Sequence, residues 1–333
     1  MQISSARSPA SLTLGLSVGV LALAGCLYLG LMLGAADLDR ATVWQALFQF
    51  DGSTDHLIVR TVRLPRSLLA IVAGSSLAVA GAIAQGLTRN PLASPDILGV
   101  NVGASLAMVL AVFLTGSDSI GFAFVGAALA ALTVYWLGSI GRSGLTPIKL
   151  IIAGAALTSL LGSLTTSILI LNQRTLNDIR FWLAGSLSGR DLESLLSIWP
   201  YVAVGLVGAL LLGRPLTLMN LGEDVAQGLG LNTLWVKLGA AIVVVLLAGS
   251  IVSLAGPIGF VGLVVPHIVR FGVGVDYRWV LPYSILLGGI FLSLVDTLAR
   301  WVVQPFEIPV GIMTALVGAP FFVYLCRSRL KKR

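Results

Sequence analysis

Few residues of this chain could do chemistry in an apolar environment. Asp296 is the only acid close to the interior of a long apolar run, and Arg300 follows it by one helical turn, which predicts a local ion pair. Of the two histidines, His56 lies in a polar connection and His267 at the end of an apolar run. No Gly-Lys-Ser or Gly-Lys-Thr occurs, so the chain lacks a phosphate-binding loop for ATP. The sequence predicts no catalytic residue and no metal site.

Two arginines at a predicted helix start are candidates for contact with a partner. Arg63 and Arg66 lie on either side of Pro65, where positive charge opposes the helix dipole. An acidic partner outside the membrane would explain this placement, and Arg300 could join the same surface. The alternative is that these arginines only anchor helix ends at the lipid interface.

A polar segment, residues 214–237, separates two long apolar runs. Leu221 to Gly228 can form about two helical turns, with carboxylates in the first turn and glycines that end it. Leu221, Val225 and Leu229 then share one face. Such a projection, which we call the knob, predicts contact with another protein, although a plain surface loop is the alternative. The candidate contact residues are Leu221, Gly222, Glu223, Asp224, Gly228 and Gly230.

The composition identifies the elements that position these residues. Of 333 residues, 57% are hydrophobic and 11% are charged, which excludes a water-soluble globule. Because lipid cannot satisfy backbone polar groups and the apolar runs are continuous, the spans must be helices. We therefore predict a single all-α membrane domain over residues 1–333 with about ten spans. They cover roughly residues 11–36, 67–87, 101–114, 120–137, 148–171, 195–212, 238–254, a span within 255–270, 281–299 and 310–325.

Two stretches rich in proline and glycine, residues 89–99 and 255–270, interrupt this pattern. The first cannot continue a helix and predicts a broken segment buried against other helices. The candidate helix-break or pathway residues are Asn90, Pro91, Pro95, Gly99, Gly256, Pro257, Pro266 and His267.

Basic residues indicate the orientation. If alternate connections lie on the same side, one side is strongly positive and the other slightly negative, and the chain carries +7 in total. Because positive loops stay inside, both termini and the knob are expected in the cytoplasm, with residues 37–62 and 172–193 outside. The charge is spread over short loops and the C-terminal tail, so it does not indicate nucleic acid. Cys26 and Cys326 form no disulfide or metal pattern.

Taken together, these motifs resemble the FecCD-type permeases of bacterial ABC importers for iron-siderophores, haem and cobalamin. The resemblance extends from about Arg60 to the C-terminus and, around residues 180–191, is strongest to the ferric-siderophore branch, ferric dicitrate permeases included. The motifs that carry it are Arg63-Leu-Pro-Arg66, Asn90 to Gly99, Leu221-Gly-Glu-Asp224 with Gly228-Leu-Gly230, Gly256 to His267, Leu298-Ala-Arg300, Ile308 to Gly311 and Gly318-Ala-Pro320.

The resemblance implies a type II ABC importer permease of ten helices in the bacterial inner membrane. It implies a non-catalytic subunit with a second permease subunit, a cytoplasmic ATPase dimer that binds ATP and Mg, and a periplasmic binding protein. Arg63, Arg66 and Arg300 would face acidic residues of that binding protein, and the knob would fit a cleft in the ATPase. The cargo would be a ferric siderophore, with ferric citrate a candidate. Haem, cobalamin, an ion-driven secondary transporter and a purely structural membrane subunit are the alternatives.

Overall fold

The structure is a computed structural model that describes residues 9–34, 38–141, 145–304 and 306–330. It is 82% helical and has no strand in these ranges. Within the described residues, seven helical stretches are long and apolar enough to cross a membrane. Three shorter apolar segments, Val100–Thr115, Val261–Val273 and Val310–Tyr324, complete the ten predicted spans.

The ten spans correspond to the following elements: α1 (Pro9–Met32), α4 (Leu64–Thr88), α5 (Val100–Thr115), α6 (Ile120–Ser139), α7 (Pro147–Leu171), α9 (Leu192–Leu211), α12 (Thr233–Val244) continued by a π-helical turn (Val245–Gly249) and α13 (Ser250–Ala255), α14 (Val261–Val273), α15 (Tyr277–Trp301) and α16 (Val310–Leu330).

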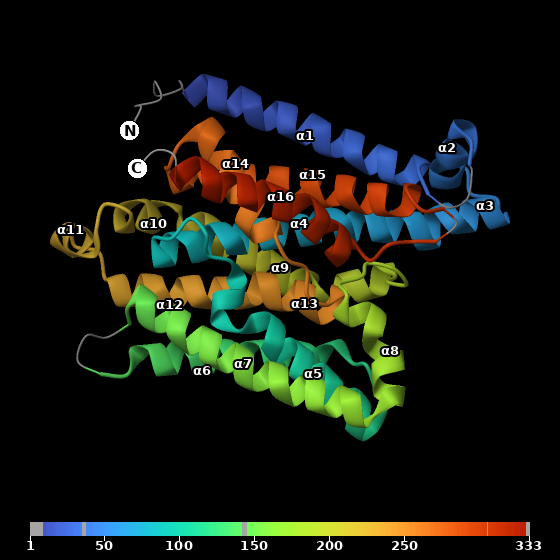
Figure 1. Ribbon diagram of the computed structural model, residues 1–333. Coiled ribbons are helices and arrows are strands. Elements are labelled where there is room, and N and C mark those ends of the chain that lie inside the picture. Colours follow the sequence, from blue (N-terminus) through green and yellow to red (C-terminus); the bar gives the residue numbers. More distant parts are fainter. Residues whose placement is uncertain (1–8, 35–37, 142–144, 305, 331–333) are drawn as a thin grey trace.

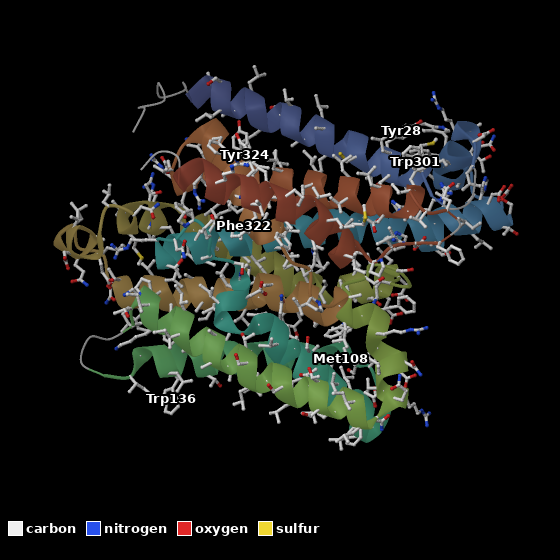
Figure 2. The ribbon with its side chains drawn as sticks, viewed as in Figure 1. Tyr28, Met108, Trp136, Trp301, Phe322 and Tyr324 are labelled. Atoms are coloured by element: carbon white, nitrogen blue, oxygen red, sulfur yellow. The ribbon has the colours of Figure 1, made fainter. Side chains whose placement is uncertain are left out.

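The spans run side by side, and short helices cover the two ends of the bundle (Figure 1). At one end lie α2 (Arg40–Phe48), α3 (Thr54–Leu57) and α8 (Gln173–Leu183); at the other lie α10 (Gly213–Met219) and α11 (Glu223–Gly228). The helix α4 packs against α14 and α15, while α5, α6 and α7 pack on one another. Side chains with nitrogen atoms, drawn in blue, lie mostly toward the two ends of the bundle (Figure 2).

Small residues let α4 lie very close to its neighbours. A Cβ on Gly74 would lie 2.1 Å from the carbonyl oxygen of Gly288 in α15, and a Cβ on Gly81 would lie 1.9 Å from that of Gly262 in α14. Neither position can hold a side chain without separating the helices. Close approach through small residues is the usual way to pack helices in lipid, where apolar burial drives little association.

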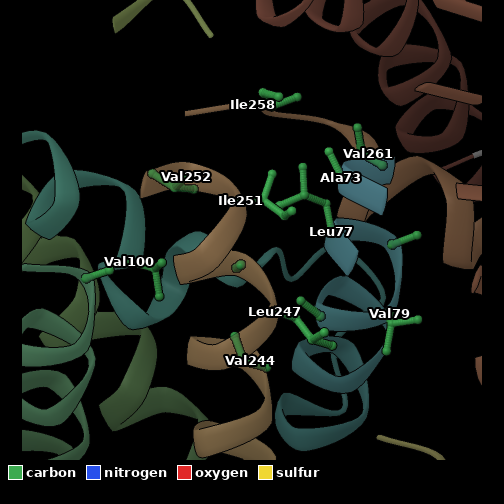
Figure 3. Packing of buried hydrophobic residues seen from close by; sticks show 14 of the residues in the cluster. Ala73, Leu77, Val79, Val100, Val244, Leu247, Ile251, Val252, Ile258 and Val261 are labelled. Atoms are coloured by element: carbon green, nitrogen blue, oxygen red, sulfur yellow. The ribbon is translucent and has the colours of Figure 1, made fainter. Parts of the chain in front are cut away.

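Larger apolar side chains of α4 belong to the main buried cluster of the bundle. Leu77 and Val79 lie in one buried cluster with Leu247 and Ile251 of the α12–α13 span (Figure 3). All four are less than 5% exposed. This cluster joins the two halves of the bundle, so α4 is the central element of the fold.

The predicted start of the second span is wrong. The sequence placed a helix start at Pro65, but the chain is already helical from Thr54, through a π-helical stretch, Ile58–Arg63, into α4. The backbone N–H of Leu64 donates to the carbonyl of Val59, five residues earlier. The N–H of Leu64 thus completes the wide turn just before Pro65, which has no N–H to donate. Arg63 and Arg66 are therefore inside a continuous helix and not at its positive end.

Candidate functional site

The knob consists of two short helices, α10 and α11, at the end of the bundle labelled α11 in Figure 1. Gly222 precedes α11 with φ of 122°, and Gly230 follows it with φ of 84°, conformations that favour glycine. The N–H of Leu231 donates to the carbonyl of Ala226 at 3.0 Å, which closes the end of α11. Gly228 was predicted to help end the helix, but it is the last helical residue and has no left-handed φ. Of the two glycines, only Gly230 adopts that conformation. The sequence also missed α10.

Three apolar side chains of the knob are open to solvent. Leu221, Val225 and Leu229 are 63%, 50% and 62% exposed. Ala226, on the other face of α11, is fully buried. Exposed apolar faces of this kind are typical of surfaces that bind other proteins.

Ion pairs fix the base of the knob. Glu223, in the first turn of α11, pairs with Lys237 of α12, and its other oxygen lies 3.6 Å from Arg89 at the end of α4. Lys237 also donates to the carbonyl of Leu145 at 3.0 Å. Asp224 is exposed. Of the two predicted acids, Glu223 therefore ties the knob to the spans and Asp224 faces outward.

At the opposite end, a buried charge cluster joins α4 to α15. Arg66 donates to Asp296 from Nε at 3.1 Å and from Nη2 at 3.0 Å, and to Glu307 from Nη1 at 2.5 Å. Arg300 Nε lies 3.2 Å from Asp296, so the ion pair predicted between Asp296 and Arg300 is confirmed. Asp296 is fully buried and is the carboxylate shared by two guanidinium groups. The sequence missed the Arg66 contacts because they join distant parts of the chain.

The three arginines expected to form an exposed docking surface are buried. Arg63, Arg66 and Arg300 are only 4%, 5% and 3% exposed. Arg63 donates to the carbonyls of Leu31 and Met32 at 2.8 Å, near the end of α1. Backbone carbonyls left free by helix ends attract cations, which explains this burial. All three arginines thus hold the chain together in this structure.

Arg66 nevertheless reaches a cavity of about 370 Å³ beside α8. Its wall includes Arg190, from the connection between α8 and α9, and Glu307. Asp118 and Asp178 lie at its exposed edge. Burial lowers the pKa of Arg190 from its usual value. The cavity combines these charged groups with apolar side chains and lies at the end of the bundle opposite to the knob.

The predicted broken segment after α4 is confirmed. The amide oxygen of Asn90 accepts the N–H of Leu92 at 3.0 Å, Pro91 lies in the turn, and Pro95 begins a short 3₁₀ helix (Pro95–Leu98). Gly99, with φ of 71°, then starts α5. The segment is packed against α7, where a Cβ on Gly154 would lie 2.1 Å from the carbonyl oxygen of Ile97.

The second glycine-proline stretch behaves differently along its length. Gly256 has φ of 75°, and a Cβ there would lie 1.8 Å from the carbonyl oxygen of Trp182, so this turn packs directly under the end of α8. Pro257 follows in the same turn. Pro266 lies inside α14 and does not break it, contrary to expectation. His267 is buried, with its ring edge-on to Phe271 at 5.0 Å between centroids.

The helical bundle with polar sites at both ends defines a membrane translocation subunit, and comparison with known proteins identifies its family. The model of the FecCD transport family matches residues 21–328. The chain therefore belongs to the FecCD transport family and is a non-catalytic permease subunit of an ABC importer for iron-siderophore or citrate-type substrates.

Individual relatives agree. The chain is 49% identical over 293 residues to the probable siderophore transport system permease protein YfiZ of Bacillus subtilis, covering 87% of this chain and 88% of the relative. It is 41% identical over 277 residues to the Fe(3+) dicitrate transport system permease protein FecC of Escherichia coli, covering 82% and 83%. A metal-chelate type ABC transporter solved in an inward-facing conformation superposes with a TM-score of 0.82 at 30% identity, covering 94% of this chain and 98% of that one.

Proposed function

We propose that this chain imports a ferric siderophore, with ferric citrate the first candidate, and that a separate ATPase drives it through the knob. The observation that carries the proposal is the exposed apolar face of Leu221, Val225 and Leu229 on a helix tied to the spans by Glu223. Membership of the family implies three partners: an ATPase dimer that itself binds ATP and Mg, a second permease subunit, and an extracytoplasmic binding protein. The knob and both termini would lie in the cytoplasm of a bacterial inner membrane, as the positive loops indicate.

The knob is tested by changing its apolar face. The double variant Leu221→Ser and Leu229→Ser should lose most ATP-driven uptake in proteoliposomes that contain the complete transporter, because the lost contacts are apolar and exposed. Leu57→Ser, an exposed leucine at the opposite end of the bundle, is the matched control and should transport normally. Unchanged uptake in the double variant would contradict the coupling role.

The cargo is tested in the same system. Ferric citrate, a ferric hydroxamate, haem and cobalamin are compared with the cognate binding protein present. Preference for a ferric chelate supports the proposal, and preference for haem or cobalamin selects another branch of the family. Uptake that survives loss of the ATPase but collapses with a protonophore would select an ion-driven carrier. Flux that survives deletion of the chain would select a structural role.

Because the arginines are buried, we propose that docking of the binding protein exchanges one ion-pair partner of Arg66 for another. The cavity beside α8, which we call the outer cavity, would admit a carboxylate of the binding protein. This carboxylate would replace Glu307, the more exposed of the two partners of Arg66. Glu307→Gln should then strengthen docking, and Arg66→Glu should weaken it in a salt-dependent way. Arg63 and Arg300, which bond to the chain itself, would support docking only by holding α1 and α15 in place. Unchanged affinity for the binding protein in both variants would contradict the proposed exchange.

A further inference from the structure

A second cavity, of about 390 Å³ and with several polar groups in its wall, lies beside the knob. Its wall is formed by the end of α4, the end of α14, the start of α15 and the connection between α10 and α11. Gln85, Arg89, Asn220, Arg270 and Tyr277 supply its polar groups. Two of these are cations, and none of the residues that line this cavity is acidic. Neither the coupling role of the knob nor the outer cavity accounts for it.

Arg270 is held in a fixed orientation by neutral groups. Its Nη1 donates to Oε1 of Gln85, and its Nη2 donates to the hydroxyl of Tyr277 at 3.0 Å. Gln85 is itself fixed, because its Nε2 donates to the carbonyl of Gly262 at 3.2 Å. A guanidinium has five N–H donors, so several remain for a ligand. In the described part of the chain no carboxylate lies within 4.0 Å of Arg270 to balance its charge.

Tyr277 is placed to serve both Arg270 and a ligand. The side chain is 1% exposed, and its hydroxyl accepts from Arg270, which leaves the hydroxyl proton free to be donated. The hydroxyl comes so near to α4 that a Cβ on Gly86 would lie 2.7 Å from it. The N–H of Tyr277 is bonded to Thr217 of α10 at 2.9 Å, which ties the same residue to the knob.

Arg89 is the second cation of the cavity, and its backbone has an unusual conformation. It ends α4 with φ of 49°, a left-handed conformation that residues other than glycine seldom adopt. Its only ion-pair partner in the described ranges is Glu223, at 3.6 Å, and Glu223 also pairs with Lys237. Arg89 and Lys237 thus share one carboxylate, and Arg270 has none within 4.0 Å in the described part of the chain. The region has an excess of positive charge.

We propose that this cavity binds a phosphate oxyanion. Guanidinium groups are suited to phosphate because their N–H donors match its oxygens in pairs, and the amide of Asn220 and the hydroxyl of Tyr277 add neutral donors. The phosphate can come from an anionic lipid headgroup or from free phosphate. Val275 in the cavity wall and Phe271, next to Arg270 in α14, are both strongly exposed and offer apolar contact to acyl chains. Basic pockets between spanning helices on the cytoplasmic side are typical headgroup sites.

This inference rests on the proposed function only for the side of the membrane that the knob faces. The full-length chain in its complete transporter is placed in nanodiscs of phosphatidylcholine, with or without phosphatidylglycerol, and in phosphatidylcholine nanodiscs with inorganic phosphate at matched ionic strength. Thermal melting and native mass spectrometry are the readouts. Phosphatidylglycerol should raise the melting temperature and remain bound.

Variants separate the site from general electrostatics. Arg270→Gln should retain phosphatidylglycerol about tenfold less well, since a charge-assisted hydrogen bond is lost. Arg89→Gln, at a partly exposed position, should act in the same direction without disturbing the core. The control is Arg278→Gln, because Arg278 is outside the cavity wall and its guanidinium already pairs with Asp276 at 2.6 Å. The side-chain hydrogen bond from Arg278 holds the pKa of Asp276 below its usual range.

The outcomes decide among the sources. Stabilisation by inorganic phosphate without retention of lipid supports the site and assigns it to free phosphate. Equal behaviour in all three nanodisc conditions, or equal loss in Arg278→Gln and Arg89→Gln, overturns the proposal. A wild-type transporter that retains the lipid but imports no ferric chelate leaves the site standing and overturns the proposed function instead.

Discussion

At the scale of single residues, the central feature is one carboxylate that serves two buried arginines. Asp296 bonds to Arg66 and Arg300, and its side chain is only 1% exposed. A buried charge is tolerated when it is paired and hydrogen-bonded, and it becomes costly when its partner is removed. Glu307 adds a second, more exposed partner for Arg66. The cluster therefore holds α4 and α15 together at the end away from the knob.

Asp296→Asn should destabilise the protein more than Glu307→Gln. Removal of the shared charge leaves Arg300 without a carboxylate partner in the described structure, and breaking such a pair costs about 3 to 5 kcal/mol. Glu307→Gln leaves the Arg66–Asp296 contacts intact. Thermal melting of both variants in the same detergent measures the difference. Equal melting temperatures would show that Asp296 does not organise the cluster.

At the scale of elements, α4 is defined by how closely other helices approach it. Gly81→Ala should push α4 away from α14, because the added Cβ would meet the carbonyl of Gly262 at 1.9 Å. Overpacking of this kind costs about 1 to 3 kcal/mol. Gly162→Ala in α7 is the matched control, since no atom lies within 4 Å of a Cβ there. The control should melt at or slightly above the wild-type temperature, because alanine favours a helix interior by up to about 1 kcal/mol. A similar loss in both variants would contradict the packing argument.

The elements show how far the sequence can predict this fold. In the described residues seven spans follow from apolar length, because a lipid environment leaves a continuous apolar run little choice but a helix, whereas Val100–Thr115, Val261–Val273 and Val310–Tyr324 are shorter apolar helices. Pro65 and Pro266 misled the prediction, since a π-helical turn and an intact α14 accommodate them. Proline restricts the local backbone, yet the neighbouring helices decide whether the helix continues through it.

The candidate sites were predictable only in part for a similar reason. The spacing of Leu221, Val225 and Leu229 gave the exposed face of the knob, and the spacing of Asp296 and Arg300 gave their ion pair, because both are local helical patterns. The contacts of Glu223 with Arg89 and Lys237, and those of Arg66 with Asp296, depend on how distant helices pack. No local pattern contains that information.

At the scale of the whole molecule, α4 connects the two polar ends. Arg66 near one end of α4 contacts α15 and Glu307, and Arg89 at the other end contacts the knob through Glu223. Between them, α4 is almost completely buried against α14, α15 and the α12–α13 span. If the knob receives force from an ATPase, as we propose, α4 is the closely packed helix that joins it to the cavity beside α8. Such a helix couples the two ends only if events at each end shift its equilibrium position.

The two acids of the knob provide a test of this connection. Glu223 is tied to Lys237 and Arg89, while Asp224, next to it, is exposed. Glu223→Gln should therefore lower the amount of substrate transported per ATP hydrolysed, with little change in the affinity of the ATPase, because it loosens the knob from the spans. Asp224→Asn should instead alter only the affinity, since that side chain is exposed on the knob, where we propose that the ATPase binds.

Transport and ATP hydrolysis are measured together in proteoliposomes, and ATPase affinity is measured by titration of the purified ATPase. The pair with Arg89 is partly exposed and contributes about 1 kcal/mol or less. Lys237 is buried, but it keeps its hydrogen bond to the carbonyl of Leu145 and can donate to the amide oxygen of the new glutamine, so Glu223→Gln should leave the fold intact. Restoring the tether requires a carboxylate at this position, and Glu223→Asp should recover part of the coupling. Equal coupling ratios for Glu223→Gln and the wild-type protein would mean that force enters the bundle elsewhere, with α10 the next element to test because Thr217 bonds to Tyr277 of α15.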